Sequence, residues 1–240
     1  MSAAAPPIKH VTTVVPARNE ADRIVACIRS LHDARIALPP GVTSSIVVVA
    51  DACRDATAEL AETHIDPSRD LVVRGESGSA GAARRLGTAT AIERTPATPA
   101  HIWVCSTDAD STVPPGWFTT QLDAARRGYV AIAGVVRLDS QTDAPVRHEF
   151  LRTYLTGADG THAHVHGTNL GFRADAYLAA GGWAPIPTAE DHDLWRRLGR
   201  LGRTISSVRL SVTTSGRTVG RAPDGFAATL ATLVAAVGAG

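Results

Sequence analysis

The chain alternates short runs of apolar residues with longer segments in which apolar residues recur at helical spacing. The apolar runs predict strands, at residues 11–15, 45–50, 71–74, 101–106 and 129–136. The longer segments predict helices, at residues 19–37, 55–63, 79–94 and 115–127. Strands that alternate with helices in this order predict an α/β fold, with a mostly parallel, doubly wound sheet and helices on both faces. Pro16 is expected to end the first strand.

The regular alternation ends near Asp139, and this change divides the chain. We expect a flexible N-terminus at 1–10, a regular α/β half at 11–137, an irregular half of the same domain at 138–225, and a C-terminal helix or tail at 226–240. A chain of 240 residues can bury roughly 70–75% of its unfolded surface, so it folds without needing disulfides or a structural metal.

Composition and charge exclude several classes of protein. Hydrophobic residues make up 44% of the chain and the formal net charge is +1, so we expect no nucleic-acid-binding surface. Cys27, Cys53 and Cys105 form no CxxC pair, so a disulfide framework or zinc knuckle is not indicated and a cytoplasmic location fits best. The N-terminus lacks a signal-peptide pattern. The apolar stretch 226–240 is too short to span a bilayer, so no transmembrane segment is expected.

Polar residues stand directly after three of the predicted strands. They occupy residues 16–20, 51–55 and 106–110, and each of these segments contains carboxylates. In a doubly wound sheet, ligands bind beyond the carboxyl ends of the strands. Carboxylates gathered there repel one another unless a cation or hydrogen-bond donors join them. This edge of the sheet is therefore the predicted ligand site.

Asp108 and Asp110 give the sharpest signal at this edge. They are separated by Ala109 and follow an apolar strand, and the two-residue period of a strand would place both carboxylates on the same side. There they can hold Mg²⁺ or Mn²⁺ together with a diphosphate, and the metal would offset the charge of a departing phosphate. Acidic pairs also commonly solvate a turn or cap a helix, so the pattern alone leaves both interpretations open.

Three other carboxylates at this edge have simpler explanations as well. Asp51 can accept a hydrogen bond from a nucleobase or a ribose hydroxyl, or serve only the local structure. Asp55 is expected to cap the helix that it precedes. Glu20, just inside a predicted helix start, can either contact a ligand or complement the helix dipole.

A glycine-rich loop, residues 75–81, opens the helix that contains Arg84. Glycines let the backbone approach a phosphate closely, and an arginine can bind it. The spacing is not GxGxxG, and no acidic residue follows at the distance expected of a dinucleotide-binding fold. A plain flexible loop explains the glycines somewhat better, although it explains Arg84 less well.

Glu190 and Asp191 begin a predicted helix in which Leu194 and Leu198 lie one turn apart and should pack inward. Acidic residues in a first turn complement the helix dipole whatever the function. The alternative is that one carboxylate is a general base that accepts the proton of an attacking hydroxyl.

Taken together, these segments resemble the family-2 glycosyltransferases, which have the GT-A fold. The matching segments occur in the family's order and are VVPARNEADRI, VVVADACRDAT, GSAGAARRLG, STDADS, HGTNLGFRADAYLAAGGW and AEDHDLWRRLGRLG. The resemblance implies an enzyme that moves a sugar from a nucleotide-diphosphate sugar to a hydroxyl acceptor, with inversion at the sugar. Residues 11–137 would then bind the donor, and residues 138–225 would bind the acceptor and carry the catalytic group.

The resemblance also implies a role for individual positions. The donor would contact Pro16, Ala17, Arg18, Glu20, Asp51, Arg84, Asp108 and Ala109. Asp110, together with Asp108, would hold Mg²⁺ or Mn²⁺. Asp191 would be the catalytic base, and Glu190 would contact the donor or the acceptor. The loop that faces the donor sugar and the acceptor would contain His166, Gly167 and Asn169.

The chain departs from the family pattern in two respects. The family commonly has two adjacent aspartates after the second strand, but Ala50 stands in the first of these positions. The membrane helices of the processive polysaccharide synthases are also missing, which favours a single transfer to a small or soluble acceptor. The nucleotide, the sugar and the acceptor are not determined by these residues, and a homodimer stays open.

Other functions have weaker support. His162, His164 and His166 could bind zinc in a hydrolase if they shared one face of a strand, but the aspartate and final histidine of the THxHxDH pattern are missing. A nucleotidyltransferase should have a glycine-rich, arginine-containing loop directly after its first strand, and residues 16–20 do not provide one. A non-catalytic nucleotide-sugar-binding protein would not need both Asp110 and Asp191. Whether His192 completes a metal site stays open.

Overall fold

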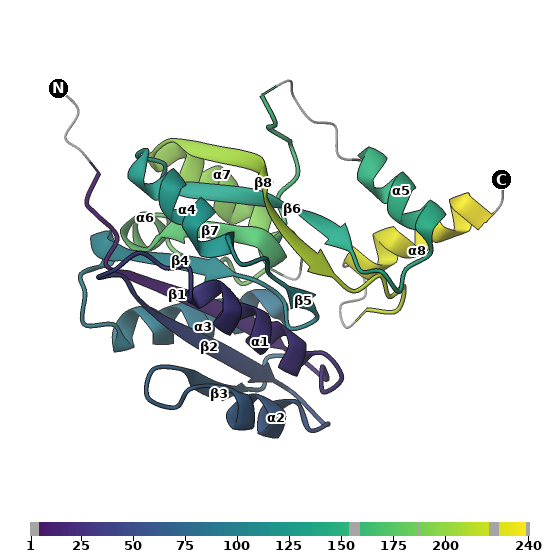
Figure 1. The fold of residues 1–240 in the computed structure, drawn as a ribbon, viewed down its shortest axis with the longest axis horizontal. Coiled ribbons are helices and arrows are strands. Elements are labelled where there is room, and N and C mark those ends of the chain that lie inside the picture. Colours follow the sequence, from purple (N-terminus) through teal and green to yellow (C-terminus); the bar gives the residue numbers. More distant parts are fainter. Residues whose placement is uncertain (1–4, 154–158, 187, 221–225, 239–240) are drawn as a thin grey trace.

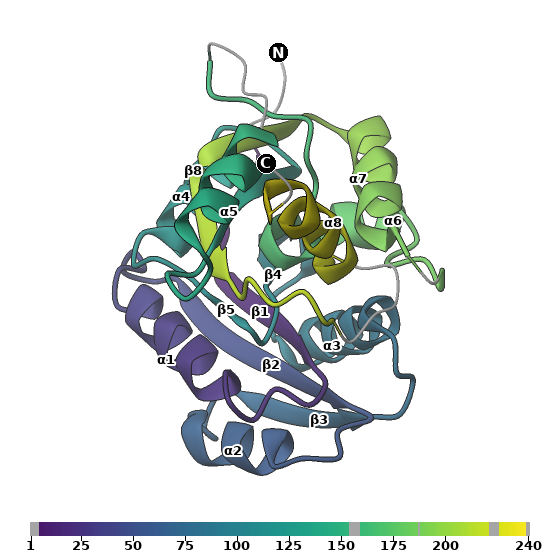
Figure 2. The same ribbon diagram turned by 90° about the vertical axis from the view of Figure 1, so that its right-hand side faces the viewer.

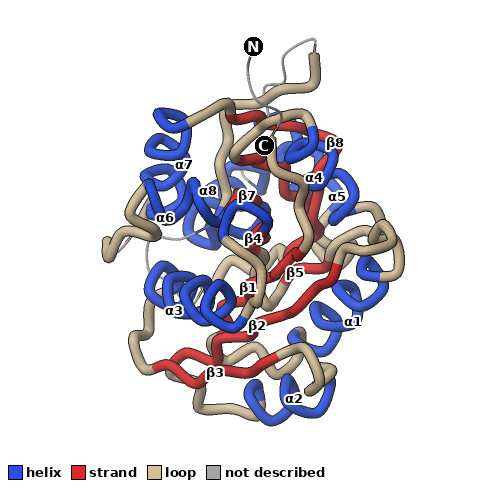
Figure 3. Tube along the Cα trace, turned by 90° about the vertical axis from the view of Figure 1, so that its left-hand side faces the viewer, coloured by secondary structure: helices blue, strands red, loops and turns tan. Residues whose placement is uncertain are grey.

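The computed structural model describes residues 5–153, 159–186, 188–220 and 226–238 (Figure 1). Within these residues, one sheet has the strand order β3-β2-β1-β4-β7-β6-β8-β5. In that order the strands are Leu71–Gly75, Thr43–Asp51, His10–Ala17, Ile102–Ser106, Leu170–Arg173, Ala131–Leu138, Thr204–Thr214 and Ser111–Thr112. Figure 3 shows the strands as one twisted layer between helices.

The sheet is mostly parallel, as the sequence predicts. β3, β2, β1 and β4 are parallel to one another, and β6 is parallel to β8. β7 runs antiparallel to both β4 and β6, and β5 runs antiparallel to β8. Since β7 pairs with β4, the regular and irregular halves of the chain share a single sheet.

Helices cover both faces of the sheet (Figure 2). From α1 to α8 they are Ile24–Arg35, Thr57–His64, Ala80–Arg94, Trp117–Arg126, Ala144–Thr153, Ala174–Ala179, Glu190–Leu201 and Phe226–Gly238. One hydrophobic core contains buried residues of α1, α2, α4 and α5, and a second contains those of α3, α6 and α7. In α7, Leu194 and Leu198 are fully buried, as their spacing predicts.

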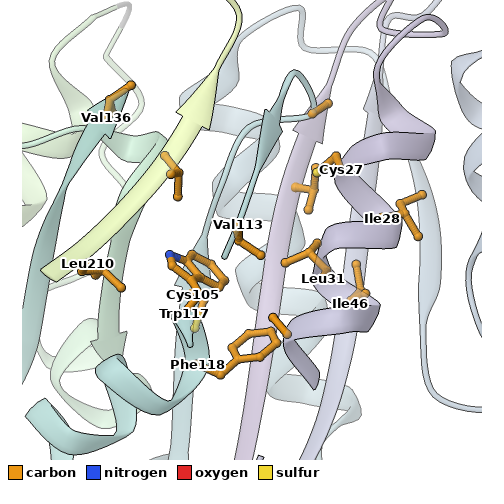
Figure 4. Packing of buried hydrophobic residues seen from close by; sticks show 14 of the residues in the cluster. Cys27, Ile28, Leu31, Ile46, Cys105, Val113, Trp117, Phe118, Val136 and Leu210 are labelled. Carbon is orange, nitrogen blue, oxygen red and sulfur yellow. The ribbon is translucent and has the colours of Figure 1, made fainter. Parts of the chain in front are cut away.

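The first core shows why these segments form helices. Ile24, Ile28 and Leu31 lie on one face of α1 and are fully buried, which is the spacing of an amphipathic helix. Figure 4 shows this face of α1 packing near Trp117 and Phe118 of α4. The rings of Trp117 and Phe118 lie 5.2 Å apart, so large side chains fill the space between the helices and the sheet.

The first strand is longer than predicted. β1 continues through Pro16 to Ala17, whereas Pro16 was expected to end it. β1 pairs with β4 only as far as Val14, so the backbone of Pro16 has a neighbouring strand on one side only. Because proline lacks an N–H group, it is tolerated where a strand has an open side.

The structure describes part of the predicted N-terminal segment and most of the predicted C-terminal segment. Residues 1–4 of the predicted flexible N-terminus lie outside the described residues. Beyond them, the amide of Lys9 donates to the carbonyl of His101, and His10 begins β1. The predicted C-terminal helix or tail is a helix, α8, which stands with α5 beyond the carboxyl ends of the strands (Figures 1 and 2).

α8 packs on α5 through the rings of Phe226 and Phe150, whose centroids lie 5.5 Å apart in an edge-to-face arrangement. Such pairs contribute beyond their buried area. Among the helices of the described ranges, none is both long and apolar enough to cross a membrane.

Candidate active site

Arg84 joins Asp108, which the sequence predicts at this edge, to Glu190 at the start of the later predicted helix. Its guanidinium lies 2.5 Å from Asp108 and 2.6 Å from Glu190. Arg84 comes from α3, Asp108 follows β4, and Glu190 is the first residue of α7. The side chains of Arg84 and Glu190 are only 6% and 12% exposed, so this pair is shielded from water and strongly coupled, whereas the side chain of Asp108 is 35% exposed.

Two glycines leave room for this cluster. A Cβ atom at Gly167 would lie 2.6 Å from Cζ of Arg84, and a Cβ at Gly81 would lie 3.1 Å from Cγ of Glu190. A larger residue at either position would therefore push Arg84 or Glu190 from its place. Gly167 belongs to the loop expected to face the donor sugar and the acceptor, and here it lies directly against Arg84.

A second arginine, Arg217, joins two more of the predicted carboxylates. It forms a two-point contact with Glu20, at 2.7 and 2.5 Å, and its Nη2 lies 3.0 Å from Oδ2 of Asp110. Two-point arginine–carboxylate contacts are the strong form of this interaction. The residues after β8, which include Arg217, cross in front of the end of β1 in Figure 2.

Asp108 and Asp110 reach this site in a different way from the one predicted. β4 ends at Ser106, and the two aspartates lie in a turn that precedes β5. The turn is closed by a hydrogen bond from the amide of Ser111 to the carbonyl of Asp108. Strand alternation is therefore not the reason that they share an edge. Each carboxylate points to a different arginine, Arg84 or Arg217.

Hydroxyl groups hold the turn in place. Ser111 donates a hydrogen bond to Thr214 of β8 at 2.8 Å and contacts Thr168 at 3.1 Å. The hydroxyl of Thr214 donates to Asp110 at 3.2 Å, and that of Thr168 accepts from the amide of Asp108. Three separate parts of the chain thus fix the position of the two aspartates.

Negative charge at the site exceeds the positive charge of its arginines. Burial raises the pKa of Asp110 to about 6, the charge of Asp108 adds to this shift, and Arg217 opposes it. The ionised form of Asp110 is therefore disfavoured unless further positive charge arrives. A divalent cation would supply that charge.

The donor set fits a cation that is shared with a ligand. Mg²⁺ is usually held by one or two carboxylates, with substrate phosphates and water completing its shell, and Asp110 with Asp108 meets that need. Within the described ranges, no three histidines, cysteines, aspartates or glutamates are grouped so as to hold a metal ion. This holds also for His162, His164 and His166, which gives the zinc hydrolase alternative no support.

Asp191 is held by the loop that precedes β7. Its Oδ2 accepts a hydrogen bond from the amide of Gly167 at 2.8 Å, and its Oδ1 accepts one from the amide of His192 at 2.7 Å. Ala189, just before the Glu190–Asp191 pair, has φ of 61°. A non-glycine residue in this region is strained, and such strain occurs often at functional sites.

Two further strained residues lie at the same edge. Asn19 follows β1 with φ of 55°, and Ala52 follows β2 with φ of 52°. With Ala189, they are the described non-glycine residues that have positive φ. All three are next to predicted site residues, which adds an independent observation in favour of this edge.

The predicted nucleoside end of the site is organised around Asp51. Its carboxylate is 3% exposed and accepts hydrogen bonds from Ser77 and from the amide of Ser79. Arg18 donates to the carbonyl of Gly78 at 2.9 Å. Asp51 and Arg18 thus hold the glycine-rich loop against the ends of β1 and β2, where Pro16 and Ala17 also lie.

Asp55 has the structural role expected of it. Its Oδ1 accepts from the amide of Thr57, the first residue of α2, and its Oδ2 accepts from the amide of Ala21. Glu20 also lies here, but it precedes α1 instead of lying inside a helix start. The helix-dipole explanation of Glu20 is therefore not supported, since its carboxylate pairs with Arg217.

Asn169 corrects the sequence-based expectation for the sugar-facing loop. It is fully buried; its Oδ1 accepts from the indole of Trp117, and its Nδ2 donates to the carbonyls of Val135 and Leu210. Its side-chain amide therefore bridges β6 and β8 in the interior, where its hydrogen bonds are made within the protein. Ala109 is 2% exposed, which restricts any donor contact there to a small part of its surface.

The three histidines form a row of rings, although they do not lie in a strand. The ring centroids of His162 and His164 are 6.4 Å apart, and those of His164 and His166 are 5.9 Å apart and nearly parallel. His166 also contacts the ring of Phe226 edge-on at 6.1 Å. Burial lowers the pKa of His166 to about 4, against the opposing effect of Asp191.

This lowered pKa predicts a specific dependence of stability on pH. Between pH 4 and 6.5 the unfolded chain binds the proton of His166 more readily than the folded one, so stability from this group rises with pH across that window. As the pH falls from 6.5 to 4.5, the free energy of unfolding should decrease less in a His166→Gln variant than in the wild type, as measured by urea denaturation. Parallel pH profiles for the variant and the wild type would contradict the expectation.

Removing Arg84 should strongly destabilise the fold. The substitution Arg84→Met leaves Glu190 without its buried partner, and breaking a buried pair in this way costs about 3–5 kcal/mol. Asp108 adds little to this loss, because its side chain is 35% exposed and water can solvate it. Urea denaturation measures this loss. Arg74→Met is the matched control, because Arg74 pairs with Glu59 and Glu62 on the surface and its loss should change stability little. Equal midpoints for the two variants would refute the structural role of Arg84.

Fold and site together define the class of protein: a GT-A-type sheet whose carboxyl edge gathers acidic residues around two arginines. The chain belongs to glycosyltransferase family 2, since the family model described as "Glycosyltransferase like family 2" matches residues 6–231. This match confirms the predicted family and the assignment to a class of enzymes.

Among individual relatives, the chain is 32% identical over 139 residues to the succinoglycan biosynthesis protein ExoO of Rhizobium meliloti (strain 1021). That alignment covers 56% of this chain and 36% of ExoO, so the chain matches only about a third of the length of this relative.

Two solved structures share the fold. The first is S. aureus TarS 1-349 in complex with UDP-GlcNAc, with a TM-score of 0.65 and 15% identity over 95% of this chain and 66% of that one. The second is the mannosyltransferase PcManGT from Pyrobaculum calidifontis in complex with GDP-Man and Mn²⁺, with a TM-score of 0.61 and 22% identity over 91% of this chain and 61% of that one. These likenesses confirm the predicted fold.

Proposed function

We propose that the protein transfers a sugar from a nucleotide-diphosphate sugar to a hydroxyl group of an acceptor, with inversion at the anomeric carbon. The observation that carries this proposal is the gathering of Glu20, Asp108, Asp110 and Glu190 around Arg84 and Arg217 at one edge of the sheet. Related folds are known in complex with UDP-GlcNAc, and with GDP-Man and Mn²⁺, which supports a nucleotide-sugar donor and a divalent metal.

Asp110 is the residue that we expect to hold Mg²⁺ or Mn²⁺, with Asp108 assisting. When bound, the metal supplies positive charge to the departing diphosphate. Arg217 lies beside Asp110, so it is placed to donate hydrogen bonds to phosphate oxygens at the same position. Arg84 acts differently, because it is buried and holds Asp108 and Glu190 in place.

Asp191 is the proposed general base. The acceptor oxygen forms a bond to the anomeric carbon, the bond to the diphosphate breaks with its electron pair, and the proton of the acceptor hydroxyl passes to Asp191. The amide of Gly167 donates to Oδ2 of Asp191. This hydrogen bond fixes the orientation of the carboxylate that is to accept the proton. General-base groups of this kind contribute about 10²–10⁴-fold to rates.

Release of products from the donor tests the proposal without knowledge of the acceptor. Purified protein is incubated with UDP-GlcNAc or GDP-mannose and Mn²⁺, and the nucleoside diphosphate and free sugar are quantified. We expect slow release of both from at least one nucleotide sugar, and no release once EDTA is added. Release that EDTA leaves unchanged would contradict the metal-dependent mechanism, and binding without release would favour a non-catalytic nucleotide-sugar-binding protein.

A further inference from the structure

A cavity lies outside the carboxylate site. It has a volume of about 680 Å³ and lies between α7, the first half of β8, residues 159–163 and the loop from α4 to β6. Its lining includes two aromatic residues, two arginines, one aspartate and one histidine, which are Tyr129, Trp195, Arg127, Arg209, Asp159 and His162. Hydroxyl side chains of β8 complete the wall. None of these residues has a role in the proposed transfer.

Two arginines contact Tyr129, one of the aromatic side chains of this cavity. The guanidinium of Arg203 lies 4.4 Å from the ring centre of Tyr129 and donates a hydrogen bond to its phenol oxygen. Arg127 lies 5.3 Å from the same ring centre. A fixed aromatic side chain offers contact area at low entropic cost, and together with Trp195 it can pack against the C–H groups of a sugar.

The polar lining favours an anionic ligand with several hydroxyl groups. The lining carries the charges of two arginines, Arg127 and Arg209, against the one carboxylate of Asp159, whose Oδ1 accepts from the amide and hydroxyl of Thr161. Arg209, by contrast, forms no ion pair with any residue of the described ranges, and its five donors suit a carboxylate or a phosphate. Ser206 and Ser207 add hydroxyl groups that can exchange hydrogen bonds with those of a sugar.

Two parts of the chain connect the cavity to Asp191. Trp195 lies four residues after Asp191 on α7, so the two side chains share one face of the helix. His162 lines the cavity, and the row of rings runs from it through His164 to His166. The next residue, Gly167, donates its amide to Asp191. The cavity and the proposed base are thus bordered by the same two segments, the first turns of α7 and residues 162–167.

We propose that this cavity binds an anionic sugar unit of the acceptor, one that carries a carboxylate or a phosphate, while another hydroxyl of the same acceptor reaches Asp191. This inference rests on the proposed function. It identifies the acceptor as an extended, negatively charged carbohydrate instead of a small neutral alcohol.

The indole signals of a ¹⁵N-labelled protein provide a direct test. The chain has 4 tryptophans, and Trp103, Trp117 and Trp183 are buried with their indole N–H groups bonded to Gln121, Asn169 and Thr88. Trp195, assigned with a Trp195→Phe variant, is the one at the cavity. Glucuronic acid, glucose 6-phosphate, glucose and inorganic phosphate are titrated in turn. We expect one of the two anionic sugars to shift the Trp195 signal with saturation.

The arginine provides the control. Arg209→Gln should weaken that binding about 10-fold or more, because a hydrogen-bonded charge is lost. Arg200→Gln, an exposed arginine of α7 outside the cavity lining, should leave it unchanged. Equal shifts with glucose, equal shifts with inorganic phosphate alone, or no shift with either anionic sugar would each overturn the proposal.

Donor binding in the same samples separates the two claims. If GDP-mannose or UDP-GlcNAc binds with Mn²⁺ but no anionic sugar moves Trp195, the cavity proposal is wrong and the transferase proposal stands. If an anionic sugar binds at Trp195 but no nucleotide sugar binds or is hydrolysed, the cavity is a sugar site and the transferase proposal fails. Arg209→Gln should leave donor hydrolysis at the wild-type rate.

Discussion

Asp191→Asn should reduce turnover by about 10²–10⁴-fold while donor binding stays close to that of the wild type, since the change removes only the general base. The asparagine keeps the size of the side chain, and its one oxygen can still accept the hydrogen bond from the amide of Gly167, while the bond from the amide of His192 is lost. The loop that precedes β7 should therefore stay in place. Transfer rates, or donor hydrolysis where the acceptor is unknown, measure the loss, and calorimetry measures donor affinity.

Asp193→Asn is the matched control for this substitution. Asp193 lies on the same turn of α7, but its carboxylate pairs with Arg196 and Arg197 on the side of the helix. Its replacement should leave turnover within a few-fold of the wild type. Comparable losses in the two variants, or near-normal turnover in the Asp191 variant, would place the base elsewhere.

The second large effect is expected at Asp110. Asp110→Asn should abolish the gain in donor affinity that Mn²⁺ provides, because the side chain loses the charge that binds the cation. Substituting a residue that only hydrogen-bonds to a metal ligand lowers metal affinity about 10–100-fold. Replacing a direct ligand should therefore lower it by at least as much. Calorimetric titration of the donor, with and without Mn²⁺, measures the change.

The Asp110→Asn variant should not lose stability. An unchanged stability would show that a loss of donor affinity comes from the missing metal ligand and not from unfolding. The pKa of Asp110 is raised to about 6, so its contribution to stability is present below its unfolded pKa and is lost as the pH rises through 6. At neutral pH the charged carboxylate opposes folding, and the neutral amide removes that penalty.

Asp123→Asn, on the exposed side of α4, should change neither donor affinity nor its dependence on Mn²⁺. An unchanged effect of Mn²⁺ in the Asp110 variant would remove Asp110 from the metal site.

The first half of the fold can be predicted because its strands are buried on both faces. A strand such as β2, buried along nearly all of its length, appears in the sequence as a continuous apolar run. β8 has no such run. Its residues are mostly half-buried, since its outer neighbour, β5, covers only two residues of it. β7 is four residues long, which is too short for a pattern to be distinctive.

The same difference explains what could be foreseen at the site. Residues after β1, β2 and β4 were predicted to share an edge, and Arg217 does bring together Glu20, which follows β1, and Asp110, which follows β4. Arg217 was missed because it follows β8, the strand that the pattern does not reveal. Asn169 was misjudged because its burial depends on β6 and β8 lying side by side, which no local pattern encodes.

A thermal-shift panel of nucleotide sugars with and without Mn²⁺ tests the central claim, that the acidic edge exists to hold a cation and a diphosphate. A ligand that binds the folded state at 100 times its Kd adds about 2.7 kcal/mol, or about 5–10 °C in Tm for a domain of this size. We predict that at least one nucleotide-diphosphate sugar raises Tm by this amount, and only when Mn²⁺ is present. If no nucleotide sugar raises Tm under either condition, the carboxylates of this edge do not form a donor site.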